Sequence, residues 1–169
     1  MKVNNKGFSY IEMILVVSIT AVMVGMVTIT MSVVNRNNVS KGANKLENGL
    51  AKAQVMCMAH GSVNGAMTLM CENGKYYYYF GNDYDNRVLF CQSPCTVTLT
   101  SIDGAVTSDL ATTSCVLSFK NTTGGLNTSV SSSLPIIYSK ITIENRNKYR
   151  ADLNIDKITG NVRYEFISY

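Results

Sequence analysis

Apolar residues gather near the start of the chain. The stretch from Met13 to Val34 contains no charged residue, whereas most of the remaining sequence alternates short apolar and polar runs. As an α-helix with a rise of 1.5 Å per residue, this stretch would be ~33 Å long, enough to cross the hydrocarbon core of a bilayer. Lys2 and Lys6 precede it, and positive residues favour the cytoplasmic end of such a helix. The pattern predicts a single-pass cytoplasmic (inner) membrane protein whose C-terminal part is exported.

A second helical pattern follows after a polar break at residues 35–38. Apolar residues then recur at the spacing of one helix face: Leu46, Leu50, Ala53 and Cys57. His60 and Gly61 provide a plausible helix end. The sequence therefore predicts one long N-terminal helix, whose second half at residues 35–61 is amphipathic and packs on a sheet.

Residues 62–169 have the pattern of a β-rich globular head. Asn73-Gly74 is a strong hairpin signal between two runs of strand-forming residues, and Thr159-Gly160-Asn161 marks a second turn. The expected strands are Ala66–Cys71, Lys75–Phe80, Arg87–Cys91, Thr96–Thr100, Cys115–Lys120, Ile141–Ile143, Ala151–Ile155 and Val162–Tyr164. The predicted fold class is α+β: a long N-terminal helix, transmembrane and then amphipathic, packed on an antiparallel β-sheet.

A glutamate stands at the start of the apolar stretch. An ionised Glu12 in such a segment would cost on the order of 3 kcal/mol by insertion scales, so we expect it to have a partner or a function. The alternative is a carboxylate that reaches the membrane interface. A Sec-type signal peptide has a shorter apolar core followed by small residues, which this sequence lacks. A plain membrane anchor explains the length of the stretch but leaves the glutamate unexplained.

The residues from Gly7 to Glu12, Gly-Phe-Ser-Tyr-Ile-Glu, resemble the cleavage and methylation signature of type IV prepilins and pseudopilins. The resemblance covers residues 1–34. It implies that residues 1–7 are a leader peptide that prepilin peptidase removes after Gly7. It also implies that Phe8 becomes the N-terminus and is N-methylated, and that residues 8–34 form the transmembrane and assembly helix. Many major pilins carry a proline in this helix where the present sequence has Ile29.

The resemblance also implies a partner for Glu12, namely the α-ammonium of Phe8 in a neighbouring pilin or pseudopilin subunit. Two opposite charges buried together in a filament offset each other's desolvation penalty and fix the stagger of the subunits. Two weaker likenesses, at residues 50–61 and 141–162, are to H-type pseudopilins and their minor-pilin relatives. They imply a minor subunit at or near the tip of an extracellular filament on the cell surface.

The formal net charge of +4 suggests a nucleic-acid partner, but removal of residues 1–7 would take Lys2 and Lys6 with it and halve that charge. So mild a charge does not imply a polyanion partner. The alternative hypothesis, a DNA-binding minor pilin acting in DNA uptake, depends on a basic edge for phosphates: Arg146, Lys148 and Arg150. Acidic neighbours weaken it, and a charged edge that discourages strand pairing is the competing interpretation.

Five cysteines are candidates for disulfide bonds in an exported domain, with one thiol left over: Cys57, Cys71, Cys91, Cys95 and Cys115. Cys91 and Cys95 are close enough in sequence to close a small loop around Pro94. Free buried thiols and a zinc site are the alternatives. Zinc is disfavoured because the pair lacks a second matching pair and because the single histidine, His60, is distant in sequence. The connectivity cannot be derived from the sequence.

No catalytic, cofactor or metal-binding motif is recognisable, so we expect neither an enzyme nor a bound cofactor. The sequence leaves three hypotheses. The first is a minor pilin or pseudopilin that is cleaved by prepilin peptidase and built into a filament. The second is the DNA-binding variant of such a subunit. The third is a single-pass surface protein that belongs to no filament.

Overall fold

The structure is a computed structural model of the 169-residue chain. It describes residues 9–127, 137–145 and 148–168, and of residues 27–32 it describes the backbone alone. The chain divides into two units, Met1–Asn35 and Arg36–Tyr169. Helix α1 is Tyr10–His60, and its part after Asn35 belongs to the second unit, which also contains the strands.

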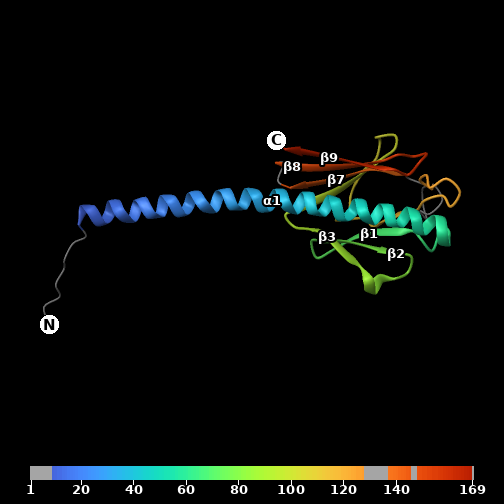
Figure 1. The fold of residues 1–169 in the computed structure, drawn as a ribbon, viewed down its shortest axis with the longest axis horizontal. Helices are drawn as coiled ribbons and strands as arrows, with labels where there is room; N and C mark the ends of the chain where they lie inside the picture. Colours follow the sequence, from blue (N-terminus) through green and yellow to red (C-terminus); the bar gives the residue numbers. More distant parts are fainter. Residues whose placement is uncertain (1–8, 128–136, 146–147, 169) are drawn as a thin grey trace. The chain divides into compact units, whose positions relative to one another are not determined.

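The described strands of the second unit form two antiparallel sheets (Figure 1). The first sheet has the order β3-β2-β1-β6, with β1 Met67–Glu72, β2 Lys75–Phe80, β3 Val88–Gln92 and β6 Cys115–Leu117. The second sheet has the order β5-β4-β7-β8-β9, with β4 Cys95–Ser101, β5 Thr107–Asp109, β7 Tyr138–Asn145, β8 Tyr149–Ile155 and β9 Val162–Ser168. A short 3₁₀ helix, η1 Tyr84–Asn86, precedes β3.

The predicted turns have the backbone conformation that their residues favour. Asn73 and Gly74, between β1 and β2, have φ of 52° and 71°, as a two-residue hairpin turn requires. Gly61 ends α1 with φ of 87°, and Gly160 lies at the predicted turn before β9 with φ of 71°. These positive values are common only for glycine and, less often, asparagine.

The second half of α1 carries the stripe that organises the core. The four predicted core positions on it are completely buried, and two further residues extend the stripe toward the first unit: Val39, Ala43, Leu46, Leu50, Ala53 and Cys57. Their alternating spacing of three and four residues places them on one side of the helix. The helix therefore supplies a continuous apolar face to the strands.

Helix α1 contacts both sheets, and Figure 1 shows its residues after 35 between strands β1–β3 and strands β7–β9. On the first sheet, Gly42 and Gly49 allow close approach to the Phe90 carbonyl oxygen and the Tyr78 ring. On the second, the Arg36 guanidinium lies 5.7 Å from the centre of the Phe166 ring. Both sheets thus share one helix as their core layer.

Gln54 connects the C-terminal part of α1 to two loops of the head. The side-chain amide of Gln54 donates hydrogen bonds to the carbonyl oxygens of Gly124 and Thr159, at 3.0 and 2.7 Å. These two acceptors lie on separate loops, so one helical side chain holds two connections of the head together.

Two parts of the predicted fold class are wrong. The head contains two antiparallel sheets of four and five strands, where the sequence analysis predicted one. Local periodicity reveals strands but not their non-local partners, and β3 and β4, adjacent in sequence, belong to different sheets. The predicted transmembrane helix is also corrected, because among the described residues no helix is long and apolar enough to cross a membrane. A span needs about 20 apolar residues, and in the apolar part the side chains are described from Tyr10 to Met26 and again at Val33 and Val34.

The close approach of α1 to the first sheet gives a test of this packing. A Cβ at Gly42 would lie 2.8 Å from the Phe90 carbonyl oxygen, a backbone atom that cannot rotate away. We expect Gly42→Ala to lower the free energy of unfolding by about 1–3 kcal/mol, although alanine is normally the better helix former. Thermal and urea unfolding followed by circular dichroism would measure it. Asn48→Ala, at an exposed position of the same helix, is the control and should leave stability unchanged or slightly raised. Stabilisation by Gly42→Ala would contradict the described contact.

Candidate functional site

Glu12 caps the N-terminus of α1. The backbone N–H of Ser9 donates a hydrogen bond of 2.9 Å to Oε2 of Glu12. The Ser9 carbonyl oxygen in turn accepts bonds from the N–H groups of Glu12 and Met13, at 3.0 and 3.2 Å. This is the glutamate half of a capping box, and it places a carboxylate at the positive end of the helix dipole. In the described chain, Glu12 therefore has a local partner.

The apolar side chains that follow Glu12 are exposed. Tyr10 is 82% exposed and Met26 is 64% exposed, and the large apolar residues between them are exposed too: Ile11, Met13, Ile14, Leu15, Val16, Val17, Ile19, Val22, Met23 and Val24. Consecutive apolar residues occupy every side of a helix, so this segment has no polar face. We call Tyr10–Met26 the apolar segment. A contiguous apolar surface of this kind marks an interaction site.

The serine and the threonine inside the apolar segment bond to the backbone of the helix. Ser18 Oγ donates to the Ile14 carbonyl oxygen at 2.7 Å, and Thr20 Oγ1 donates to the Val16 carbonyl oxygen at 2.9 Å. Each hydroxyl hydrogen is thereby satisfied within the helix and needs no water. The part of the segment after Glu12 consequently suits an apolar environment.

The predicted leader and cleavage residues are not part of the described structure. Gly7 and Phe8 lie outside the described residues, so the predicted cleavage, the N-methylation of Phe8 and its pairing with Glu12 stay predictions.

The predicted basic edge is brought together only in part. Arg146 lies outside the described residues, and Lys148 is exposed in the turn between β7 and β8. Arg150, on β8, places its Nε 2.8 Å from Oδ1 of Asp152. Lys140, on the neighbouring strand β7, places its Nζ 2.8 Å from Oδ2 of the same carboxylate. The Arg150 charge is thus paired with Asp152 within the sheet, which weakens its electrostatic attraction for a phosphate.

Asp152 is the centre of this ion-pair group. Its side chain is buried, and Thr142 Oγ1 donates a further hydrogen bond of 2.8 Å to it. Burial alone would raise the pKa of Asp152. The hydrogen bonds from Arg150, Lys140 and Thr142 outweigh burial and hold the pKa below its ordinary value. The carboxylate is therefore a structural anion that orders two cations on the surface of the second sheet.

All five cysteines are free thiols in the structure. Four are buried and Cys71 is partly buried. Burial raises the pKa of Cys115 to about 12 and also raises the pKa of Cys57, so both stay protonated and unreactive at neutral pH. Within the described residues, no group of three or more His, Cys, Asp or Glu side chains is placed to hold a metal ion. The disulfide bonds expected from the sequence stay a prediction.

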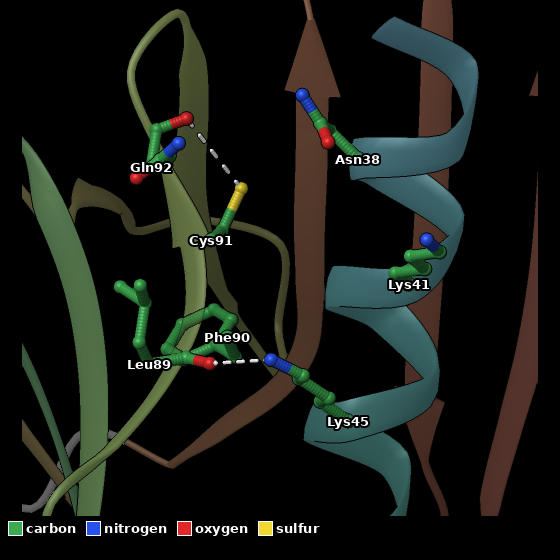
Figure 2. A pocket seen from close by; sticks show the side chains of 7 residues that line it. All are labelled: Asn38, Lys41, Lys45, Leu89, Phe90, Cys91 and Gln92. Atoms are coloured by element: carbon green, nitrogen blue, oxygen red, sulfur yellow. Dashed lines mark hydrogen bonds between the residues drawn. The ribbon is translucent and has the colours of Figure 1, made fainter. Parts of the chain in front are cut away.

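A groove of about 190 Å³ lies between α1 and strand β3, and Figure 2 shows the residues that line it: Asn38, Lys41, Lys45, Leu89, Phe90, Cys91 and Gln92. Strand β3 is an edge of the first sheet, so its outer backbone groups need partners from elsewhere. Lys45 Nζ donates a hydrogen bond of 3.0 Å to the Leu89 carbonyl oxygen. The groove thus combines a lysine-covered strand edge with the side chain of Cys91.

Two of these features were not predicted from the sequence, for different reasons. The capping contact was readable, because a serine three residues before a glutamate at a helix start is its usual signature, here Ser9 and Glu12. The group around Asp152 was not readable, because Thr142 and Lys140 reach it from a neighbouring strand whose pairing the sequence does not reveal.

The lowered pKa of Asp152 predicts how stability depends on pH. Its contribution is complete above the unfolded-state pKa of about 3.9 and is lost as pH falls through the lower folded-state value. We expect Asp152→Asn to lower the free energy of unfolding by about 1–3 kcal/mol at pH 7. The difference in free energy of unfolding between the variant and the wild type should become smaller at the acid end of a urea-unfolding series. Asp103→Asn, at an exposed position, is the control for loss of one charge. A difference in free energy of unfolding that does not change with pH would contradict the lowered pKa of Asp152.

Comparison of the chain with known protein families, with curated proteins and with solved structures finds no match.

Proposed function

We propose that the chain is a structural subunit of a type IV pilus-like filament, a minor pilin or pseudopilin that assembles through the apolar segment of α1. The proposal includes cleavage after Gly7 by prepilin peptidase and further pilin or pseudopilin subunits as partners. The observation that carries it is the apolar segment, exposed on all sides and closed at its start by Glu12. The Gly7-Phe8 signature supports the assignment of this segment to pilin-like assembly.

Burial of the apolar segment is the driving force in this proposal. Removing apolar surface from water stabilises by about 25 cal/mol per Å². A docking groove on one partner would cover one face of the helix and leave the opposite face in water. A bundle of like helices covers every side at once, and such a bundle is the core of a pilin-like filament. The distribution of the exposed side chains therefore favours polymerisation over pairwise docking.

Glu12 is suited to act in the free subunit and in the filament. Its bond to the Ser9 N–H uses Oε2, which leaves Oε1 to accept a bond from a second donor. After cleavage, the α-ammonium of Phe8 in an adjacent subunit would be that donor. The local bond holds the carboxylate in place at the helix end, so less side-chain entropy is lost when the second bond forms.

Substitution of Glu12 separates these two roles. Glutamine retains an acceptor for the Ser9 N–H but has no charge, whereas alanine loses both. We expect Glu12→Gln and Glu12→Ala to reduce incorporation into filaments alike, by on the order of 100-fold, because either would leave an ammonium buried without its anion. Immunoblots of sheared filaments against total protein would measure incorporation, and the mass of the mature chain would confirm that processing continues. Normal incorporation of Glu12→Gln would show that capping is the only role of the carboxylate.

The leader prediction can be checked without a variant. In a host that contains prepilin peptidase, we expect the mature chain to begin at Phe8 and to carry one methyl group on its α-nitrogen. N-terminal peptide mass spectrometry of the filament fraction would show both. In a peptidase-deficient host, the same peptide should begin upstream of Gly7. A surface form that begins at Met1 or Lys2 in the peptidase-containing host would contradict the proposed function.

A further inference from the structure

Two cysteine thiols meet where the first sheet passes into the second. Cys91 is near the end of β3 and Cys95 is the first residue of β4, with Ser93 and Pro94 in the turn between them. Both side chains are buried, and the two thiols lie near enough to shift each other's pKa. The three-residue connection between them allows the Cα separation of about 4.4–6.8 Å that a disulfide bond requires.

The strand register argues against other pairings with the partly buried thiol of Cys71. Cys71 lies opposite Tyr76 on β2, and Tyr76 lies opposite Cys91 on β3. Two strand spacings separate Cys71 from Cys91, or about 9.5 Å between Cα atoms, beyond the reach of a disulfide of about 6.8 Å. Cys115 lies opposite Leu69 on the strand next to β1, which makes it a diagonal neighbour of Cys71 at roughly 7–8 Å.

A buried amide accompanies the thiol pair. Asn145 lies opposite Cys95 in the register of β4 and β7, and its side chain is completely buried. That amide finds no hydrogen-bond partner among the described residues, and it lies near enough to Cys95 to influence the pKa of its thiol. The Cys91 thiol, and after it Asn145, lower the pKa of Cys95, while the same contact raises the pKa of Cys91. Cys95 is therefore the thiol of the pair that ionises more readily.

We propose that Cys91 and Cys95 are a modification site at which a small-molecule disulfide oxidant, such as oxidised glutathione, forms an intramolecular disulfide bond. The groove between α1 and β3 gives the oxidant access to Cys91. Figure 2 shows the Cys91 sulfur pointing from β3 into the space beside α1, and Cys91 is among the residues that line the groove.

The exchange balances in two steps. Cys91, which lines the groove, gives up its proton and its sulfur attacks one sulfur of the oxidant, whose S–S bond breaks as the first oxidant thiolate leaves. The Cys95 thiolate then attacks the Cys91 sulfur, which forms the protein disulfide and releases the second oxidant thiolate. The two cysteine protons pass to the two released thiolates. The cysteine pair loses two electrons and the oxidant gains them.

The bond would connect the two sheets beside their shared helix. Strand β3 is an edge of the first sheet and β4 is an inner strand of the second. A covalent link at this position reduces the freedom with which the sheets separate when the head unfolds. The thiols belong to the second unit, so the proposal does not depend on filament assembly.

A thiol count on the purified full-length wild-type chain tests the proposal. After incubation with oxidised glutathione, we expect the folded monomer to lose two titratable thiols and about 2 Da of mass, with no glutathione retained. Tandem mass spectrometry should place the bond between Cys91 and Cys95. The melting temperature should rise by about 4–8 °C in the oxidised form and return on reduction with dithiothreitol.

Single serine variants provide the matched comparison. Cys91→Ser and Cys95→Ser should each abolish the loss of two thiols, whereas Cys71→Ser and Cys115→Ser should retain it. An unchanged thiol count in the oxidised wild type would overturn the proposal without the use of any variant. A bond that involves Cys57, Cys71 or Cys115, or a disulfide between two chains, would overturn it as well.

Discussion

The head depends on one constraint, the use of a single helix face as the common core of two sheets. The buried stripe of α1 from Val39 to Cys57 is completely enclosed. Two glycines bring the helix close to one sheet, and Arg36 and Gln54 reach the second sheet and its loops. Neither sheet could bury its apolar residues to the same extent without the helix, because an isolated sheet leaves one face in water. The position of the groove and of the cysteine pair follows from this arrangement.

Sequence periodicity predicted where the helix and strands lie along the chain but not which strands pair. The stripe at Leu46, Leu50, Ala53 and Cys57 and the turn at Asn73-Gly74 depend on local spacing, and the structure confirms both. The division into two sheets depends on which strands pair across long separations, as when β4 pairs with β7, and periodicity contains no such information. The same limit hid the ion-pair group at Asp152 and left the cysteine connectivity open.

The two ends of the helix meet different physical requirements. The apolar segment exposes side chains on every side of the helix, and its Ser18 and Thr20 hydroxyl groups bond to the helix backbone. Its part after Glu12 is therefore suited to surroundings without water. The later half has one apolar face, with lysines such as Lys41 exposed away from it. A chain built in this way can change its surroundings along the first part of the helix while the fold of the second part stays the same.

The bonds of Gln54 bear on the order in which the head can form. Gln54 and Thr159 are separated by 105 positions, and they meet in the folded head. Closing so long a loop is entropically costly, and folds dominated by distant pairings form slowly. During synthesis, more than half of the chain must therefore be made after Gln54 before Thr159 can accept its hydrogen bond. During that interval, the stripe that later forms the core of the head stays accessible to chaperones and prone to aggregation.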